Sequence, residues 1–224
     1  MAVCGGRVRY GGHGGRHRGS AGVRAATVQN IPINQERLML GDANSVPTVN
    51  RRLLHVGRKF NFEMLTLTEP GKPTLQREVV RHPGAVIVLP LADGPRGQEI
   101  VMIRNWRLSV EDWMWELPAG TLEKGEDPLA CAARELEEET GHKAATIEPL
   151  CRFHTSPGLS DELMWAFVAR GLAEGPQHLE VDEHVTVHRL SAYECVRRAE
   201  AGEMTDAKSM LVLLLAARKG LIRT

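Results

Sequence analysis

The sequence predicts an α/β (α+β) protein in which a mixed β-sheet is packed between helices and a small antiparallel β-sheet precedes it at the N-terminal side. Short strand-like runs outnumber helical patterns and cluster in blocks, which is typical of a mixed sheet with helices packed on it. With 224 residues, the chain can hold one catalytic domain and an appendage, but not two ordinary enzyme domains. We therefore expect one buried core.

Residues 1–35 are expected to form a disordered tail. They contain no acidic side chain, five arginines and a glycine-rich run, so they offer little apolar surface to offset the entropy lost on ordering. An arginine-rich, acid-free start is also typical of an organelle transit peptide, although this segment has no clear amphipathic period. Both interpretations remain open from the sequence.

A small N-terminal β region is expected over residues 36–81. Apolar and polar residues alternate over residues 59–67, a tight turn follows at 69–72, and a second strand follows at 74–80. Two strands alone bury too little apolar surface to fold independently. We therefore expect this hairpin to lean on the main domain or on a second subunit.

The main domain is expected over residues 82–224. Strand patterns occupy residues 85–91, 99–104, 147–153, 163–169 and 184–190. Helical patterns occupy residues 128–140, 192–201 and 206–219. The longest apolar run has eight residues, far fewer than the roughly 20 that a membrane-spanning helix needs, so we expect no membrane partner.

Charge and cysteine usage argue against several classes of protein. Lys plus Arg and Asp plus Glu both total 28, so the average charge gives no reason to expect a nucleic-acid partner or an anionic membrane. The four cysteines are scattered and form no CxxC pair or other metal-ligand spacing. We expect reduced thiols and a cytoplasmic protein.

One short acidic helix carries the most chemical information. Pro128 suits its first turn and Gly141 suits the left-handed position that ends it. Glu135, Glu138 and Glu139 share one face, where like charges repel unless a cation lies among them. Mg²⁺ is the expected cation because it prefers oxygen ligands. Taken alone, the triplet is more typical of a solvated acidic face than of a metal site.

The wider pattern is more specific than the triplet. Gly120 is followed after five residues by Glu126, and after seven more by Arg-Glu-Leu-Glu-Glu-Glu-Thr-Gly at residues 134–141. This spacing resembles the signature of the Nudix hydrolase family, and the resemblance extends from about residue 77 to the C-terminus. It implies the Nudix fold and a Mg²⁺-dependent pyrophosphohydrolase, with Mn²⁺ able to replace Mg²⁺. One departure is His142, which stands where the signature has an aliphatic packing residue.

Strings on both sides of the signature resemble the ADP-ribose pyrophosphatase branch of the family. They comprise residues 104–107 and 115–120 before it and residues 156–160 after it, with Pro157 sixteen residues past Gly141. The resemblance implies hydrolysis of a nucleoside diphosphate sugar, with ADP-ribose, giving AMP and ribose 5-phosphate, as the best single candidate. UDP-glucose or GDP-mannose pyrophosphatase, a nucleoside triphosphate sanitiser, and a non-catalytic nucleotide-sensing module stay open as alternatives.

The same resemblance assigns roles near the acidic helix. The metal ligands would be the backbone carbonyl of Ala119 together with Glu135, Glu138 and Glu139. The catalytic base would come from a loop before a late strand, where Glu183 is the first candidate and Glu180 the second. Glu138 is the other residue expected to take part in catalysis.

Substrate contacts are assigned in the same way. Arg107 resembles an arginine that contacts the substrate phosphates, and Arg77 with Glu78 resembles a dipeptide that reaches the nucleotide from the N-terminal sheet. Arginine suits this role because its planar fork grips phosphate bidentately, although an exposed arginine is often only a surface charge. Ser156, in the string after the signature, is the fourth expected contact. An exchanged-domain homodimer, typical of this branch, would support the N-terminal sheet.

Overall fold

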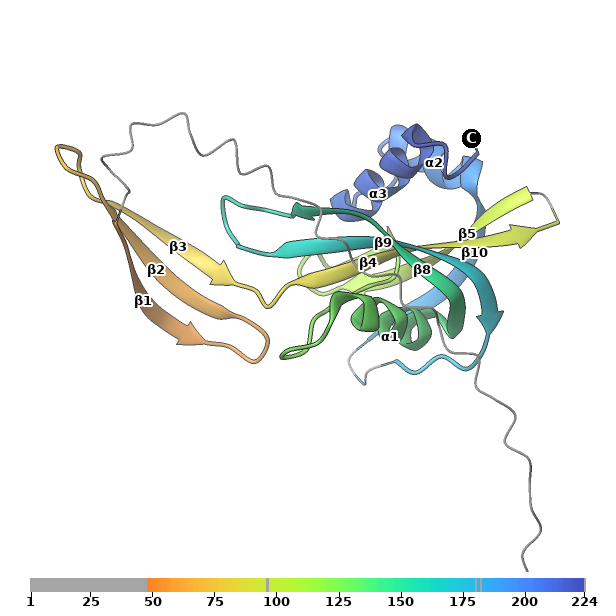
Figure 1. The fold of residues 1–224 in the computed structure, drawn as a ribbon, viewed down its shortest axis with the longest axis horizontal. Coiled ribbons are helices and arrows are strands. Elements are labelled where there is room, and N and C mark those ends of the chain that lie inside the picture. Colours follow the sequence, from red (N-terminus) through yellow and green to blue (C-terminus); the bar gives the residue numbers. More distant parts are fainter. Residues whose placement is uncertain (1–47, 96, 180, 182, 224) are drawn as a thin grey trace, which may run out of the picture.

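The computed structural model (Figure 1) describes residues 48–95, 97–179, 181 and 183–223. The tail expected at residues 1–35 and the second candidate base, Glu180, lie outside these residues. In the described part, a small sheet lies to one side of a larger body that is built from a second sheet and helices.

The small sheet has three antiparallel strands, in the order β1-β2-β3. They are β1 (Thr48–Val56), β2 (Asn61–Thr68) and β3 (Leu75–Arg81). The two-stranded hairpin expected from the sequence was therefore one strand short. Strand β1 was missed because its paired Arg51-Arg52 and Leu53-Leu54 break the apolar alternation, and it is held by backbone pairing with β2.

The larger sheet contains seven strands, ordered β10-β5-β4-β9-β8, with β6 added beside β5 and β7 beside β4. Strands β4 and β9 pair in parallel, and the other neighbouring strands of this sheet pair antiparallel, so the expected mixed sheet is confirmed. The strands are β4 (Ala85–Gly94), β5 (Gly97–Arg107), β6 (Asp112–Glu116), β7 (Ala119–Thr121), β8 (His142–His154), β9 (Leu163–Glu174) and β10 (Val185–Ser191).

Helices cover both faces of this sheet (Figure 1). They are α1 (Pro128–Thr140), α2 (Ala192–Glu200) and α3 (Ala207–Arg218). Successive residues of β4 alternate between two hydrophobic clusters: Val86 lies in one with Leu136 of α1, and Ile87 lies in the other with Leu213 of α3. Burial on both faces explains why β4 reads as a continuous apolar run.

The small sheet is tied to the main body where β3 ends. The backbone N–H of Val80 donates to the carbonyl of Leu159, at 2.9 Å. The carboxylate of Asp161 accepts from Arg81 Nη1 at 2.8 Å and from the backbone N–H of His82 at 2.9 Å. These contacts fix the segment that joins β3 to β4. Across the described residues, no helix is long and apolar enough to cross a membrane.

Candidate active site

The acidic helix α1 is fixed at both ends, as its sequence predicts. Asp127 is the N-cap, and its side chain accepts hydrogen bonds from the first turn, with Oδ1 lying 2.8 Å from the N–H of Leu129. Gly141 ends the helix with a φ of 71°, in the left-handed region that favours glycine. The positions of the glutamates along α1 are therefore well defined.

The glutamates of α1 meet the backbone of β7 at a glycine. A Cβ added to Gly120 would lie only 1.9 Å from Cδ of Glu135, so Glu135 can approach this strand only because residue 120 has no side chain. The backbone N–H of Ala119 donates to Oε2 of Glu139 at 2.8 Å. Glu135 and Glu139 thus lie against the Ala119–Gly120 backbone.

Both of these carboxyl groups are buried. Glu135 is 8% exposed and Glu139 is 3% exposed. Burial, reinforced by neighbouring carboxylates, raises the pKa of Glu135 to about 7, against the opposing effect of Arg134. Burial raises the pKa of Glu139 well above its ordinary value, and the charge of Glu135 adds to this shift. In such a place a carboxylate is stabilised either by a proton or by a cation.

Arg134 organises the other side of α1. Its Nη1 donates to Oε1 of Glu135 at 2.7 Å and to Oε2 of Glu138 at 2.9 Å. Its Nε and Nη2 donate to the two oxygens of Glu126, at 2.9 and 3.0 Å. The hydrogen bonds from Arg134 lower the pKa of Glu126 to about 2. Arg134, held by Glu126, therefore orients Glu135, a positioning role that the sequence analysis did not assign.

The donor set suits a hard divalent cation. Among the described residues, no three His, Cys, Asp or Glu side chains already lie close enough together to hold a metal ion. Glu135 and Glu139 nevertheless provide two buried carboxylates at one place, and Mg²⁺ is commonly held by one or two carboxylates together with substrate phosphates. The Glu135 carboxylate lies in the space that a Cβ at Gly120 would fill. Glu138 is less buried than the other two and is held by Arg134.

Glu183 is brought toward the same place from the segment before β10. Its charge contributes to the raised pKa of both Glu135 and Glu139. After β9 the chain returns to α1, where the N–H of His178 donates to the carbonyl of Glu138 at 3.0 Å. Glu183 follows five residues later. The first candidate base therefore lies near the buried glutamates.

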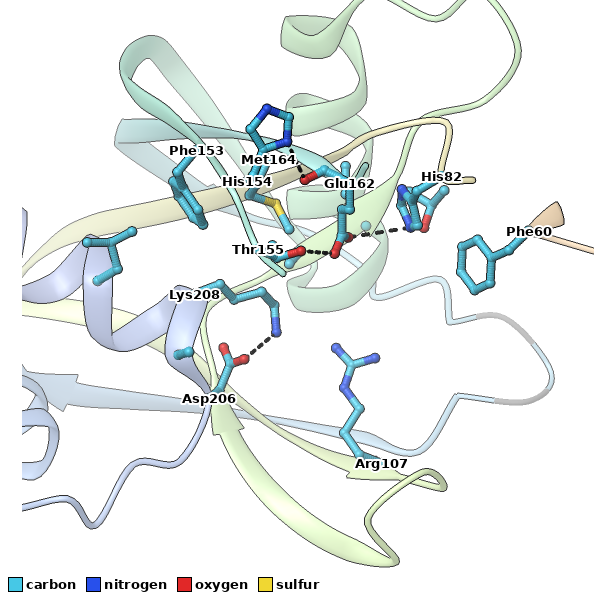
Figure 2. Close-up of a pocket in the computed structure, with 16 residues that line it drawn as sticks. Phe60, His82, Arg107, Phe153, His154, Thr155, Glu162, Met164, Asp206 and Lys208 are labelled. Carbon is cyan, nitrogen blue, oxygen red and sulfur yellow. Dashed lines mark hydrogen bonds and ion pairs between the residues drawn. The ribbon is translucent and has the colours of Figure 1, made fainter. Parts of the chain in front are cut away.

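A cavity of about 460 Å³ opens beside Ala119, Gly120 and Thr121 (Figure 2). Of the four residues expected to contact the substrate, Arg107 of β5 lines this cavity in the single chain. Arg77, Glu78 and Ser156 are exposed and are not among the lining residues, although Thr155, next to Ser156, is. Arg77 instead donates from Nη1 to the carbonyl of Gln76 at 2.8 Å.

One wall of the cavity was not anticipated from the sequence. The ring of His82 stacks on Phe60, with 4.7 Å between ring centroids. Nδ1 of His82 accepts from the N–H of Gly84 at 3.0 Å, which leaves the proton on Nε2, 3.4 Å from Oε1 of Glu162. Burial lowers the pKa of His82, against the opposing charge of Glu162. Glu162 also accepts a hydrogen bond from Thr155. These contacts are tertiary, so no local pattern could have revealed them.

The chain is similar in sequence to known proteins of one family. The NUDIX domain family matches residues 81–211. The chain is 36% identical over 164 residues to an ADP-ribose pyrophosphatase of Bacillus subtilis, covering 72% of this chain and 87% of that protein. It is 35% identical over 163 residues to an ADP-ribose pyrophosphatase of Mycobacterium tuberculosis, covering 71% and 77%.

Two further matches widen the comparison. The chain is 37% identical over 168 residues to a methanol dehydrogenase activator of Bacillus methanolicus, covering 74% of this chain and 89% of that protein. A crystal structure of an ADP compounds hydrolase superimposes with a TM-score of 0.68 at 22% identity, covering 80% of this chain and 97% of that one, which shows a common fold. From its signature, its fold and these matches, we conclude that the chain belongs to the Nudix family and is a Nudix hydrolase.

Proposed function

We propose that the protein hydrolyses the diphosphate bond of a nucleoside diphosphate sugar, with ADP-ribose, giving AMP and ribose 5-phosphate, as the substrate. The observation that carries this proposal is the cavity, which is lined by Arg107 and by the Ala119–Gly120 segment. Glu135 and Glu139 do not line it themselves, but both lie against the backbone of that segment. A negatively charged diphosphate needs cationic groups on both sides. The relatives named as ADP-ribose pyrophosphatases support the choice of substrate.

The residues of α1 and β7 would hold the cofactor. The carbonyl of Ala119 and the carboxylates of Glu135 and Glu139 would bind Mg²⁺, or Mn²⁺ in its place, and Glu138 is a further oxygen donor on the same helix. The ion would supply a lowered pKa for the attacking water and would neutralise charge on the leaving phosphate. Gly120 leaves room for Glu135 to serve in this role.

Arg107 and Glu183 would complete the reaction. Arg107 would grip the diphosphate through its guanidinium, because a planar fork binds phosphate oxygens bidentately. Glu183 would accept the proton of the attacking water, and its proximity to Glu135 and Glu139 supports this assignment. Glu138 is the other carboxylate that could take the proton, since it lies on the same helix at the edge of the buried pair.

We also propose that the protein is a homodimer in which each small sheet covers its partner. Several large apolar side chains of this sheet are exposed in the single chain: Val49, Leu53, Leu54, Val56 and Phe62. Large apolar side chains exposed together on one small sheet favour an interaction site there. Arg77 and Glu78, which do not line the cavity of their own chain, would then reach toward the partner's cavity. Light scattering should give twice the chain mass of 24.7 kDa.

A second candidate function is a nucleotide-sensing module that acts on a partner enzyme without turnover. It is favoured by the relative named as a methanol dehydrogenase activator. The buried pair Glu135 and Glu139 argues against it, because a module that only binds has no need to bury two neighbouring carboxylates.

A substrate panel distinguishes these candidates. The protein is incubated with Mg²⁺ and, separately, ADP-ribose, UDP-glucose, GDP-mannose, NADH and a nucleoside triphosphate, and the products are separated by chromatography. We expect AMP and ribose 5-phosphate from ADP-ribose at the highest rate. Faster turnover of another sugar nucleotide would make that compound the substrate. Release of pyrophosphate from the triphosphate would indicate a nucleoside triphosphate sanitiser. Binding without any turnover would favour the sensing module.

A further inference from the structure

Arg107 is held by a carboxylate that is completely buried. Glu116, at the end of β6, is 0% exposed. Its Oε1 accepts from Arg107 Nε at 2.7 Å and its Oε2 accepts from Arg107 Nη2 at 2.5 Å. This is a bidentate pair, which fixes the plane of the guanidinium as well as its position. The two bonds leave Nη1 of Arg107 without a hydrogen-bond partner among the described residues.

A second cation reaches the same carboxylate from the C-terminal helix. Nζ of Lys208 donates to Oε2 of Glu116 at 2.9 Å and to Oδ1 of Asp206 at 2.7 Å. Lys208 also lines the cavity, and Figure 2 shows its ammonium group on the side of the cavity that faces Arg107. Glu116 therefore pairs with two cations, one at the end of β5 and one in the first turn of α3.

The first turn of α3 locks this arrangement to the backbone. Asp206 is the N-cap of α3 and accepts from the N–H of Ser209 at 3.1 Å. The hydroxyl oxygen of Ser209, fully buried, accepts from the backbone N–H of Leu117 at 2.8 Å. Leu117 directly follows Glu116. Helix α3 therefore holds Glu116 in two ways: Lys208 contacts its carboxylate, and Ser209 contacts the next peptide N–H.

The charges in this cluster balance but are unfavourable to bury. Burial opposes the charge of Glu116, and the hydrogen bonds and charges of Arg107 and Lys208 overcome this, so the pKa of Glu116 is lowered. A buried ion pair of this kind often adds no stability over apolar residues of the same size. Its effect is instead geometric, since it gives Arg107 one orientation at the edge of the cavity.

We propose that Glu116 and Lys208 are positioning residues that hold Arg107 in the orientation in which it binds the diphosphate. The proposal rests on the function proposed above. The fixed guanidinium pays no ordering entropy when the substrate arrives, and Nη1 is left to bind a phosphate oxygen. The class of ligand that this arrangement recognises is the diphosphate shared by all nucleoside diphosphate sugars.

The test uses the full chain and three variants in this cluster. They are Glu116→Gln, which removes the charge at constant size, Arg107→Ala, and the combination of both. We expect Glu116→Gln to lower kcat/KM for ADP-ribose with Mg²⁺ by about 10- to 100-fold, the range for losing one charge-assisted hydrogen bond. In the Arg107→Ala background the same change should cost less than about twofold, because Glu116 acts through Arg107. If Glu116→Gln lowered kcat/KM by the same factor with and without Arg107, Glu116 would not act through Arg107, and the proposal would be overturned.

A charge-balanced variant separates positioning from stability. Glu116→Gln leaves two cations, Arg107 and Lys208, facing the single carboxylate of Asp206, so its Tm is expected to fall. Adding Lys208→Met restores the balance and should recover most of the Tm, while kcat/KM should remain at least about tenfold below the wild type. Recovery of both quantities would mean that Glu116 and Lys208 are merely structural, and this would overturn the proposal.

The structure offers a matched control in the same sheet. Glu99 is also buried and pairs with an arginine on a neighbouring strand, with 3.0 Å between its Oε2 and Nε of Arg189. The exposed fractions of the two arginine side chains are nearly equal, at 38% for Arg189 and 39% for Arg107. Neither Glu99 nor Arg189 lines the cavity beside Ala119. Glu99→Gln should therefore leave kcat/KM within about twofold of the wild type.

A readout without substrate keeps this test independent of the substrate assignment. The Nε–Hε signal of Arg107 can be followed by nuclear magnetic resonance of ¹⁵N-arginine-labelled protein and assigned with Arg107→Lys. Its exchange with water should accelerate by about tenfold or more in Glu116→Gln and stay unchanged in Glu99→Gln. Unchanged exchange in Glu116→Gln would overturn the positioning role. Failure of wild-type protein to hydrolyse ADP-ribose would refute only the proposed substrate.

Discussion

Gly120→Ala should separate the metal site from the fold. The new Cβ would lie 1.9 Å from Cδ and 2.0 Å from Oε1 of Glu135. Carbon atoms in contact rest about 3.5 to 4.0 Å apart, so the carboxylate must retreat by roughly 1.5 Å. It can do so because it is the end of a flexible side chain and no backbone atom blocks the added Cβ more closely.

The size of the functional effect follows from this displacement. Misplacing a positioned group by about 1 Å can cost roughly 100-fold in rate, so kcat/KM of Gly120→Ala should fall by about that factor. The concentration of Mg²⁺ that gives half-maximal rate should rise, because one of the two buried carboxylates no longer lies in place. Turnover of ADP-ribose is measured across a Mg²⁺ titration, with Tm recorded alongside.

Gly94→Ala is the matched control for this experiment. Its added Cβ would lie 2.1 Å from Cδ of Glu99, so the same clash with a buried glutamate occurs far from the cavity. We expect a comparable change in Tm and a kcat/KM within about twofold of the wild type. Wild-type turnover with an unchanged Mg²⁺ requirement in Gly120→Ala, or an equal loss of activity in Gly94→Ala, would refute the reasoning.

Three further outcomes follow from individual side chains. Glu139→Gln should lose nearly all turnover without a fall in Tm in the absence of Mg²⁺, because burial already disfavours its charge; a fall in Tm together with retained turnover would contradict this. Arg134 lowers the pKa of Glu126 to about 2 from 4.5, so this pair stabilises the fold above about pH 4.5 and the stabilisation is lost as pH falls toward 2; Tm measured across this range should depend less on pH in Glu126→Gln. Leu136→Ala, at a site that is 0% exposed, should lower the free energy of unfolding by about 2–5 kcal/mol in a urea titration.

Most of the main domain could be predicted from local patterns. Strands β4, β5, β8, β9 and β10 and all three helices have apolar periods or runs that buried elements require. The ends of α1 were visible because Pro128 and Gly141 act through local backbone geometry. Strands β6 and β7 were missed because they have only five and three residues, too few to show a period.

Some residues of the candidate site could likewise be predicted from local patterns, and others could not. Glu135, Glu138 and Glu139 were proposed from their spacing on one helix face, and the structure places Glu135 and Glu139 against the Ala119–Gly120 backbone. Glu116 and Lys208 were not found, because the residues of this pair lie 92 positions apart in the chain. The fold, and no local pattern, brings them together at the cavity.

The central claim is that Glu135 and Glu139 form the cradle of a divalent cation beside the diphosphate. The most direct test is an anomalous difference map from crystals soaked in Mn²⁺ with the Glu183→Gln protein and ADP-ribose. We predict a Mn²⁺ peak about 2.0–2.2 Å from carboxylate oxygens of both residues and from a phosphate oxygen. A bound diphosphate with no cation at these carboxylates, or a cation held elsewhere, would contradict the account.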